Sequence, residues 1–264
     1  MKIALCIKQV PDTTDIKWTE HNTINREGVE SIINPYDVYA IEAALKIKNS
    51  NQTTEITALT MGPAQAESML RKTIALGVDK AVLISDKKFA GADTYATGKT
   101  LSRAVQSVLP DFSLVICGQF AIDGDTAQTG PSIANHLNIP QITFVQEIVE
   151  CTTDYIIVKR QADDGIETIK AKLPALICVL QSSEEPSRAT INGYKQAQMS
   201  EIPVLSMETL GLLPEETGIK GSPTYVSKAF RPIITRTNEK IFYSGSSAAA
   251  LKDKITEFMA GANE

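Results

Sequence analysis

The sequence predicts an α/β fold, namely a doubly wound, mainly parallel sheet with helices on both faces, a β-hairpin insertion and an extended C-terminal arm. Three observations indicate this fold. Over the first 140 residues, short β-branched runs alternate with segments of helical spacing, which is the pattern of right-handed βαβ units. Two β-rich runs around an Asp-Gly turn then indicate a hairpin. Beyond residue 180, frequent prolines and glycines interrupt the periodicity, so an arm is expected there.

The first half of the chain contains four apolar runs that suit buried parallel strands, at residues 3–10, 55–61, 80–85 and 114–118. Helical spacing between and after them predicts helices at residues 35–48, 64–75, 92–109 and 131–137. Pro35 suits a first helical turn, Gly77 is a candidate C-cap, and Pro110 would stop the third helix. The polar stretch 12–33 is expected to form an irregular excursion or a small hairpin.

The second half begins with β-structure and ends irregularly. Two β-rich runs, at 155–160 and 167–171, flank a turn at 162–165, and the apolar run 175–180 is expected to be another core strand. Beyond that strand the chain is either partly disordered or an arm that orders on a partner, and its interspersed apolar residues favour the arm. Helical spacing returns only at 248–259.

Composition and charge exclude several classes of protein. A net charge of −5 leaves no basic surface for nucleic acid. The 43% apolar content is ordinary for a soluble protein, and no run of about eighteen apolar residues is present that could span a membrane. The N-terminal apolar run is too short for a secretory signal, and the four cysteines lie far apart without a C-x-x-C pair. We therefore expect a cytoplasmic protein with free, buried thiols.

No catalytic or metal-binding motif is found. With only two histidines and no Cys/His cluster of suitable spacing, no metal site is expected. The sequence also lacks a G-x-S-x-G elbow, a G-x-x-x-x-G-K-[ST] loop, and a G-x-G-x-x-G turn after the first strand. No side chain is thus predicted to be catalytic, and any chemistry would be carried by a cofactor.

The most informative stretch is CGQFAIDGDTAQTG, at residues 117–130. It follows an expected strand and leads into an expected helix, whose first N–H groups and macrodipole could hold a phosphate. Its glycines let backbone approach a ligand, and Asp123 and Asp125 can accept hydrogen bonds from ribose or purine groups. The alternative is a βα loop whose Asp and Thr side chains only cap the helix, and spacing alone does not separate the two.

Two further loops should lie beside this stretch. Residues 9–11 and residues 61–62 also follow expected strands. Loops that follow parallel strands meet at the carboxyl edge of the sheet, which is where ligands bind in such folds. The sequence therefore predicts a ligand site at this edge, and the character of the 117–130 loop favours a nucleotide.

Several separate motifs also occur in one order along the chain. They are KIALCIKQVPDT at the start, INPYDVYAIEAAL from Ile33, TMGPAQAES from Thr60, ALGVDKAVLISD from Ala75 and GQFAIDGDTAQTG from Gly118. Together they resemble the β subunit of the electron-transfer flavoproteins, essentially from end to end. Val158-x-Arg160 through Glu167 to Leu173-Pro174-Ala175 is similar to the family's signature, with Asp163 where a glutamate is usual.

The resemblance implies a subunit that is redox-active only as a heterodimer with an α subunit, which carries an FAD. It also implies an adenine nucleotide in the β subunit, at the edge described above. By motif match, the positions that bind this nucleotide are Cys6, Asn34, Pro35, Tyr36, Asp37, Met61, Gly118, Gln119, Ala121, Ile122, Asp123, Gly124, Asp125, Thr126, Ala127, Gln128 and Thr129.

In the simpler carriers of the family the nucleotide is a structural AMP. In the electron-bifurcating branch it is a second FAD, which accepts a hydride from NADH. One electron then goes to ferredoxin or flavodoxin, and the other goes through the α-subunit FAD to a dehydrogenase.

The run FAGADTYAT at residues 89–97 is similar to a run in the bifurcating branch that AMP-binding relatives lack. It adds further positions that would bind FAD, at Gly91, Ala92, Asp93, Thr94 and Thr97. Small residues here would let a flavin approach closely. The alternative is that Asp93 and Thr94 only cap a helix while Gly91 forms a turn. The resemblance favours FAD, with AMP as the alternative.

The last part of the chain also gains a role by resemblance. In this family a recognition loop docks onto the partner dehydrogenase through one leucine, and Ile191 occupies that position here, after Ala189-Thr190. The expected partner is a flavin-dependent dehydrogenase of acyl-CoA or of hydroxy acids. Ser187-Arg188 replaces the usual Arg-Tyr, which suggests a partner other than the common acyl-CoA dehydrogenase, such as a hydroxy-acid dehydrogenase. We therefore expect a nucleotide-binding α/β domain at 1–180, followed at 181–264 by the docking loop and an arm that wraps the α subunit.

Overall fold

The computed structural model describes residues 1–12, 17–18, 24–25, 31–182, 185–227 and 248–261. The chain divides into two compact units, Met1–Lys228 and Ala229–Glu264. The described part of the second unit is one helix, α6 (Ala248–Gly261), which leaves Leu251 and Ile255 exposed. Among the residues that the structure describes, no helix is long and apolar enough to cross a membrane.

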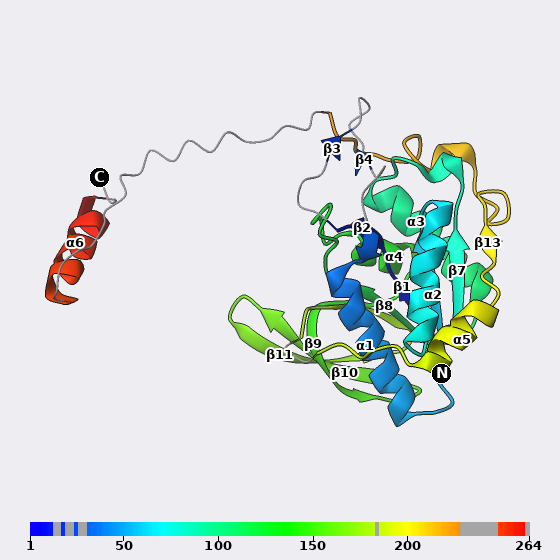
Figure 1. Cartoon of the computed structure of the whole chain (residues 1–264), viewed down its shortest axis with the longest axis horizontal. Helices are drawn as coiled ribbons and strands as arrows, with labels where there is room; N and C mark the ends of the chain where they lie inside the picture. Colours follow the sequence, from blue (N-terminus) through cyan, green and yellow to red (C-terminus); the bar gives the residue numbers. More distant parts are fainter. Residues whose placement is uncertain (13–16, 19–23, 26–30, 183–184, 228–247, 262–264) are drawn as a thin grey trace. The chain divides into compact units, whose positions relative to one another are not determined.

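A nine-stranded sheet forms the centre of the first unit (Figure 1), and its strands lie in the order β11-β10-β9-β12-β8-β1-β6-β7-β13. The strands from β9 to β13 in this order are parallel. They are β9 (Gln141–Cys151), β12 (Ala175–Val179), β8 (Leu114–Gly118), β1 (Lys2–Cys6), β6 (Glu55–Met61), β7 (Lys80–Ile84) and β13 (Val204–Leu205). The hairpin strands β10 (Tyr155–Ala162) and β11 (Gly165–Lys172) extend the sheet in antiparallel fashion. The predicted fold class, mainly parallel with a hairpin insertion, is confirmed.

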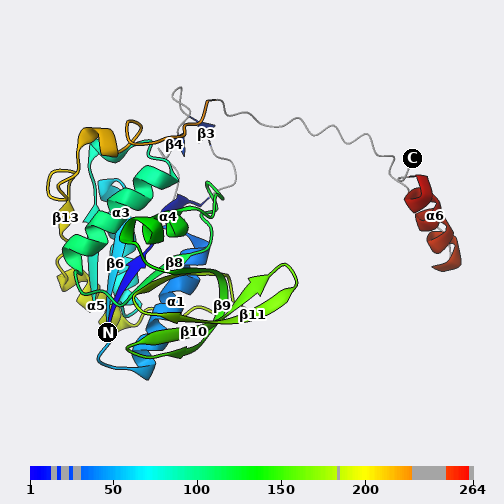
Figure 2. The same cartoon turned by 180° about the vertical axis from the view of Figure 1, so that it is seen from behind.

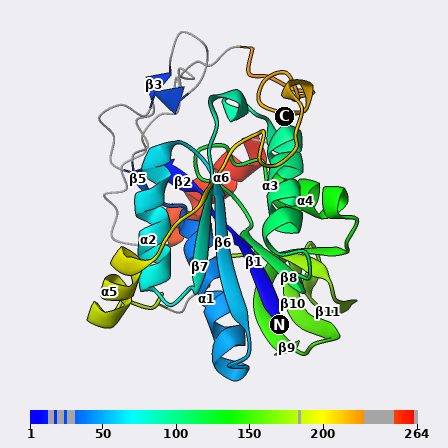
Figure 3. The ribbon, with the colours of Figure 1, turned by 90° about the vertical axis from the view of Figure 1, so that its right-hand side faces the viewer.

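Helices cover both faces of this sheet (Figures 1 and 2). One face carries α1 (Pro35–Ser50), α2 (Glu67–Ala75) and α5 (Ile191–Met199), whereas the other carries α3 (Thr94–Val108) and α4 (Thr129–Leu137). Figure 3 shows the two layers on either side of the strands. Alternate residues of β1 point to the two layers, with Ile3 and Leu5 in one core and Ala4 and Cys6 in the other. A strand that is buried on both faces has this continuous apolar sequence.

The start of the chain differs from the prediction of a single strand over residues 3–10. Strand β1 ends at Cys6, and Gln9–Pro11 forms a separate strand, β2, which pairs with β5 (Ser31–Ile33). The chain turns away because the backbone of Lys8 is bonded elsewhere. Its N–H donates to Asp37 and its carbonyl accepts from the N–H of Asn34. The excursion that follows contains the short hairpin strands β3 (Lys17–Trp18) and β4 (Ile24–Asn25), and its remaining residues lie outside the described part of the chain.

Most other predicted elements match the structure with small shifts. The predicted helix 64–75 begins with a 3₁₀ turn, η1 (Ala64–Ala66), and Gly77, with φ of 118°, follows its end. A second 3₁₀ turn, η2 (Lys87–Phe89), precedes α3. Strand β9 was not predicted, because Phe144, with φ of 58°, lies at a bulge that breaks the alternation of inward and outward residues.

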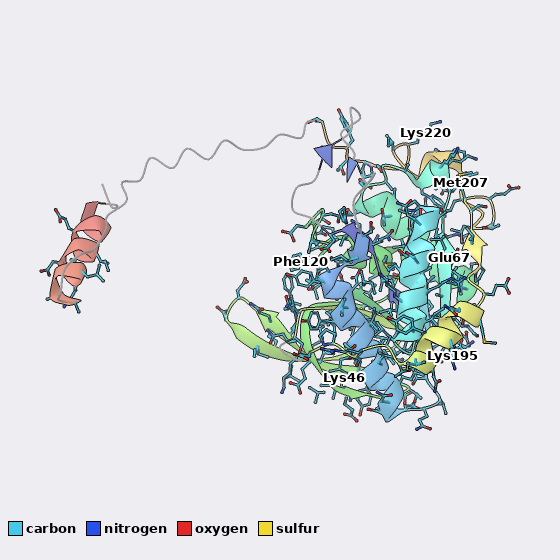
Figure 4. All side chains as sticks on the ribbon, viewed as in Figure 1. Lys46, Glu67, Phe120, Lys195, Met207 and Lys220 are labelled. Atoms are coloured by element: carbon cyan, nitrogen blue, oxygen red, sulfur yellow. The ribbon has the colours of Figure 1, made fainter. Side chains whose placement is uncertain are left out.

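Residues 185–227 belong to the first compact unit, which therefore extends past the predicted boundary at residue 180. Helix α5, which was not predicted, lies against α2, and β13 adds to the edge of β7 through the pair Val204 and Leu83. The turn η3 (Pro214–Glu216) follows, and Met207 (labelled in Figure 4), Leu210 and Leu212 are buried. Short segments that pack on an existing edge need no periodicity of their own, which is why the sequence showed no signal. An arm that wraps a partner stays a prediction for the part of the chain around α6.

The contact between α5 and α2 depends on Gly193. A Cβ atom at this position would lie 2.2 Å from the carbonyl oxygen of Ala75. Gly193→Ala is therefore expected to lower the free energy of unfolding by about 1–3 kcal/mol, measured by urea denaturation, because the two helices must separate. Gly124→Ala is the matched control, since a Cβ there meets nothing within 4 Å. Equal effects of the two substitutions would contradict this packing argument.

Candidate functional site

The loops after β1, β6 and β8 meet at one edge of the sheet, as the sequence predicted. These three strands are neighbours, and Cys6 at the end of β1 pairs in register with Leu59 on one side and Cys117 on the other. The edge thus brings together Cys6, Met61 and Gly118 with the first turn of α1. Side chains and backbone groups from four distant parts of the sequence can therefore contact one ligand here.

Asn34 ties these loops together from the N-cap position of α1. Its side chain is 1% exposed. Its Nδ2 donates to the carbonyl of Phe120 at 2.6 Å, and its Oδ1 accepts from the N–H of Ile122 at 3.2 Å. Phe120, marked in Figure 4, also packs its ring edge-on against Tyr36, with 5.2 Å between ring centroids. The start of α1 and the loop after β8 therefore hold one another in place.

Asp37 completes this connection one turn later. Its carboxylate accepts from the N–H of Lys8 at 2.6 Å and from the N–H of Gly118 at 3.1 Å. Burial raises the pKa of Asp37 to about 7, although these hydrogen bonds and the charge of Lys8 act in the opposite direction. Gly118 is required here, because a Cβ atom would lie 2.3 Å from a carboxylate oxygen of Asp37.

The loop at 118–129 has an inward and an outward part. Asp123 forms an ion pair with Lys8, and its side chain is only 3% exposed. Asp125 is exposed, and both it and Ala127 have positive φ, at 48° and 55°. Asp123 therefore holds the loop onto the end of β1, whereas Asp125 remains accessible to a ligand. The sequence analysis did not single out Lys8, although it is the one charged residue within the first apolar run.

The start of α4 is not capped by a side chain. Its N-cap residue, Gln128, makes no side-chain capping bond. The sequence had left open whether the Asp and Thr residues of the loop only cap this helix. Its first N–H groups lack intrahelical acceptors and could donate to a ligand, and binding of a ligand there stays a prediction. The helix starts close to β12, because a Cβ on Gly130 would lie 2.3 Å from the sulfur of Cys178.

Three buried thiols lie in a row beneath this helix. Cys117 pairs in register with Cys6 of β1 and with Cys178 of β12. A hydrogen bond with Cys6, followed by burial, raises the pKa of Cys117 above its ordinary value, and burial raises the pKa of Cys178 to about 12. All four cysteines are free. Cys117 and Cys178 are therefore protonated at neutral pH and act as packing residues. Within the described ranges, no cluster of His, Cys, Asp and Glu side chains is arranged to hold a metal ion.

The segment 89–97 leads into and includes the first turn of α3, which lies on the same face as α4. The interpretation of Asp93 as a helix cap is confirmed, because Oδ1 of Asp93 accepts from the N–H groups of Tyr95 and Ala96. Its Oδ2 accepts from the N–H and the hydroxyl of Thr224. Burial alone would raise the pKa of Asp93, but these bonds outweigh it and lower the pKa. Gly91 has φ of 73° and lies against Ile219, while Phe89 is buried in the core.

Helices α3 and α4 link this segment to the loop at 118–129. A Cβ on Gly98 would lie 2.2 Å from the hydroxyl of Ser132, so the two helices are in close contact. The rings of Tyr95 and His136 meet edge-on, with centroids 4.9 Å apart. The contribution of the 219–224 segment was missed by sequence reasoning, because its partner Asp93 lies about 130 residues earlier. Direct contacts of residues 91–97 with a cofactor stay a prediction.

Ile191 is the first residue of α5 and is 78% exposed. Thr190 caps this helix by accepting from the N–H of Gly193. Three residues before Thr190, Ser187 donates from its N–H and its hydroxyl to the carboxylate of Glu42, both at 2.8 Å. The loop is thus held against α1 and presents Ile191 outward, in a position where a partner could reach it. Docking through Ile191 stays a prediction.

This architecture defines a doubly wound α/β protein, a class in which ligands bind at the carboxyl ends of the strands. The chain belongs to the electron transfer flavoprotein family, because residues 21–206 match the electron transfer flavoprotein domain. It is 42% identical over 261 residues to the caffeyl-CoA reductase-Etf complex subunit CarD of Acetobacterium woodii, covering 96% of this chain and 99% of that protein.

Two other relatives are similar along most of their length. The chain is 42% identical over 238 residues to the electron transfer flavoprotein subunit beta of Megasphaera elsdenii, covering 88% of each protein. It is 40% identical over 266 residues to the acryloyl-CoA reductase electron transfer subunit gamma of Anaerotignum propionicum, covering 98% of each. The resemblance drawn from the motifs is therefore confirmed, and the chain is a β subunit that functions in electron transfer.

The raised pKa of Asp37 predicts a pH dependence of stability. Unfolded, this carboxyl ionises near its ordinary pKa of 3.8, whereas in the folded protein it does so near 7. The folded state therefore holds an extra proton between these values, and its stability falls as pH rises through this window. Relative to Asp37→Asn, the wild-type free energy of unfolding should drop by about 2–3 kcal/mol between pH 5 and pH 8. Urea denaturation at the two pH values measures this, and a pH-independent difference would refute it.

Proposed function

We propose that this chain is the β subunit of an electron-bifurcating electron transfer flavoprotein and binds FAD at the edge formed by β1, β6 and β8. The observation that carries the proposal is the convergence of the 34–37 turn, Met61 and the 118–129 loop beside the uncapped first turn of α4. Two relatives support it, since one is named a subunit of a caffeyl-CoA reductase-Etf complex and the other an electron transfer subunit of acryloyl-CoA reductase. When bound, FAD would supply the chemistry of taking a hydride from NADH and passing on single electrons.

The residues at this edge fit an adenine nucleotide. Backbone N–H groups at the start of α4, together with the positive end of its dipole, would bind phosphate. The exposed carboxylate of Asp125 can accept from a ribose hydroxyl, and the side chain of Met61 at the end of β6 offers a polarisable surface to a ring. Asn34 and Asp37 orient these groups rather than contact the ligand, because their polar atoms are bonded to the loops.

The second candidate is a non-bifurcating carrier subunit that holds AMP for structure. One observation favours it. Both carboxylate oxygens of Asp93 are bonded within the chain, and Ile219 lies over Gly91. FAD would need the 219–224 segment to leave room beside residues 91–97, whereas AMP would not need residues 91–97.

The proposal includes partners outside this chain. They are an α subunit with its own FAD, ferredoxin or flavodoxin as the low-potential acceptor, and a flavin-dependent dehydrogenase of acyl-CoA or of hydroxy acids. The cytoplasm is the compartment in which these carriers and the free thiols of this chain would be kept reduced. Redox activity then belongs to the heterodimer, and the NADH-oxidising site to this subunit.

The nucleotide content of the heterodimer tests the proposal. The chain is copurified with its α subunit, and the nucleotides are released with acid and counted by chromatography. Two FAD per heterodimer without AMP, together with oxidation of NADH, are the expected result. One FAD and one AMP would reject the bifurcating function and leave the carrier function.

Docking through Ile191 gives a separate prediction. An apolar anchor that fills a pocket contributes about 2 kcal/mol, so Ile191→Ala should slow electron transfer to the purified dehydrogenase roughly thirtyfold. Ile166→Ala is the matched control, because Ile166 is 66% exposed on the hairpin strand β11. Equal rates for the two variants would show that Ile191 is not the anchor.

A further inference from the structure

A cavity of about 430 Å³ lies between the start of α4 and the antiparallel part of the sheet. Gln119, Ala127 and Gln128 of the nucleotide loop line one side of it, and Phe144 of β9 and Arg160 of β10 line the other. Arg160 is the one charged residue among its described lining residues. Arg160, which belongs to the segment similar to the family signature, therefore lines the same cavity as the loop predicted to hold the nucleotide.

Gln119 presents a buried donor without an acceptor. The residue is 3% exposed, and its Oε1 accepts from the N–H of Phe144 at 2.6 Å. That bond fixes the orientation of the amide, because only the oxygen can accept. In the described part of the chain, Nε2 has no hydrogen-bond partner. A buried donor without an acceptor is unfavourable, so a ligand oxygen at this position would be stabilised.

The backbone at Phe144, whose N–H bonds Gln119, has an unusual conformation. Phe144 has φ of 58°, which is rare for a bulky residue, and it lies where the register of β9 shifts against β12. The bulge frees the carbonyl of Thr143, which accepts from Nε of Arg160 at 2.9 Å. Strain and an unpaired donor thus occur together, a combination found at ligand sites.

Arg160 has donors left for a ligand. Its guanidinium carries five N–H groups, and the described residues accept two of them, through Thr143 and through Glu167 at 3.0 Å. The side chain of Glu167 is half exposed, so it offsets the charge of Arg160 only in part. Gln119 and Arg160 therefore offer donors alone, next to the positive end of α4, and a matching ligand must offer several acceptor oxygens and negative charge.

We propose that this cavity is a phosphate subsite, in which Gln119 Nε2 and the Arg160 guanidinium donate to a phosphate of the nucleotide held by the 118–129 loop. The proposal rests on the proposed function, since it requires a nucleotide in that loop. A phosphate, rather than a neutral part of the nucleotide, is favoured because Gln119 Nε2 and the Arg160 guanidinium are both donors, and one of them is charged.

Comparison of AMP with adenosine isolates the contribution of the phosphate. Both ligands are titrated calorimetrically into the heterodimer after removal of its nucleotide, and the ratio of their dissociation constants is measured for each variant. Gln119→Glu replaces the donor with a carboxylate oxygen and should reduce the preference for AMP about tenfold or more. Arg160→Lys, which keeps the charge but loses the planar fork, should also reduce it. Glu167→Gln removes the competing carboxylate and should raise the preference roughly threefold.

Gln146→Glu is the matched control, because it makes the same chemical change at an exposed position of β9 outside the cavity. Its preference for AMP should equal that of the wild type. An unchanged preference in both Arg160→Lys and Glu167→Gln would overturn the subsite, even if Gln119→Glu failed to fold. If these variants weakened only the association with the α subunit, the cavity would instead receive a carboxylate of that subunit, which also overturns the proposal. Failure of the wild type to bind either FAD or AMP would overturn the proposed function itself.

Discussion

Two buried polar side chains at the start of α1 hold the functional edge of this protein together. Asn34 and Asp37 bond the backbone after β1 and the backbone after β8, at distances between 2.6 and 3.2 Å. In a low-dielectric interior each of these bonds is strong, and each unpaired group would be costly. The loops therefore have one arrangement in which every partner is satisfied. The approach of Gly118 to Asp37 depends on the same arrangement, since no side chain fits between them.

The two parts of the predicted nucleotide site differ in their hydrogen bonding. Around the 118–129 loop, donors remain available at the first turn of α4 and at Gln119. Around residues 91–97, the carboxylate of Asp93 is fully engaged with its own helix and with Thr224. An incoming phosphate therefore has more to gain near α4, whereas a ligand beside Asp93 must first compete with bonds inside the chain. Whether the site can take FAD or only AMP therefore depends on the 219–224 segment, because Thr224 occupies the carboxylate of Asp93.

The segment after β12 contributes to the core although its own sequence is irregular. Residues 204–224 cover the outer edge of the sheet, and Glu216 forms an ion pair with Lys99 of α3 at 2.7 Å. Gly218 lies close to the carbonyl of Lys88, so the chain approaches η2 without room for a side chain. Helix α5 rests on α2 in a similar way through Gly193. The outward position of Ile191 follows from this packing.

The sequence by itself determined the parallel sheet, its helices and the edge at which the loops meet. These features have local signals, because strands buried on both faces are continuously apolar and helices repeat every 3.6 residues. The motifs also determined the family. Only the tertiary structure decided the pairing of Lys8 with Asp123, the bulge at Phe144 that aims Gln119 into a cavity, and the role of Asp93 in holding residue 224. These contacts join residues far apart in the chain, and their energies depend on burial and orientation, which no local pattern of residues records.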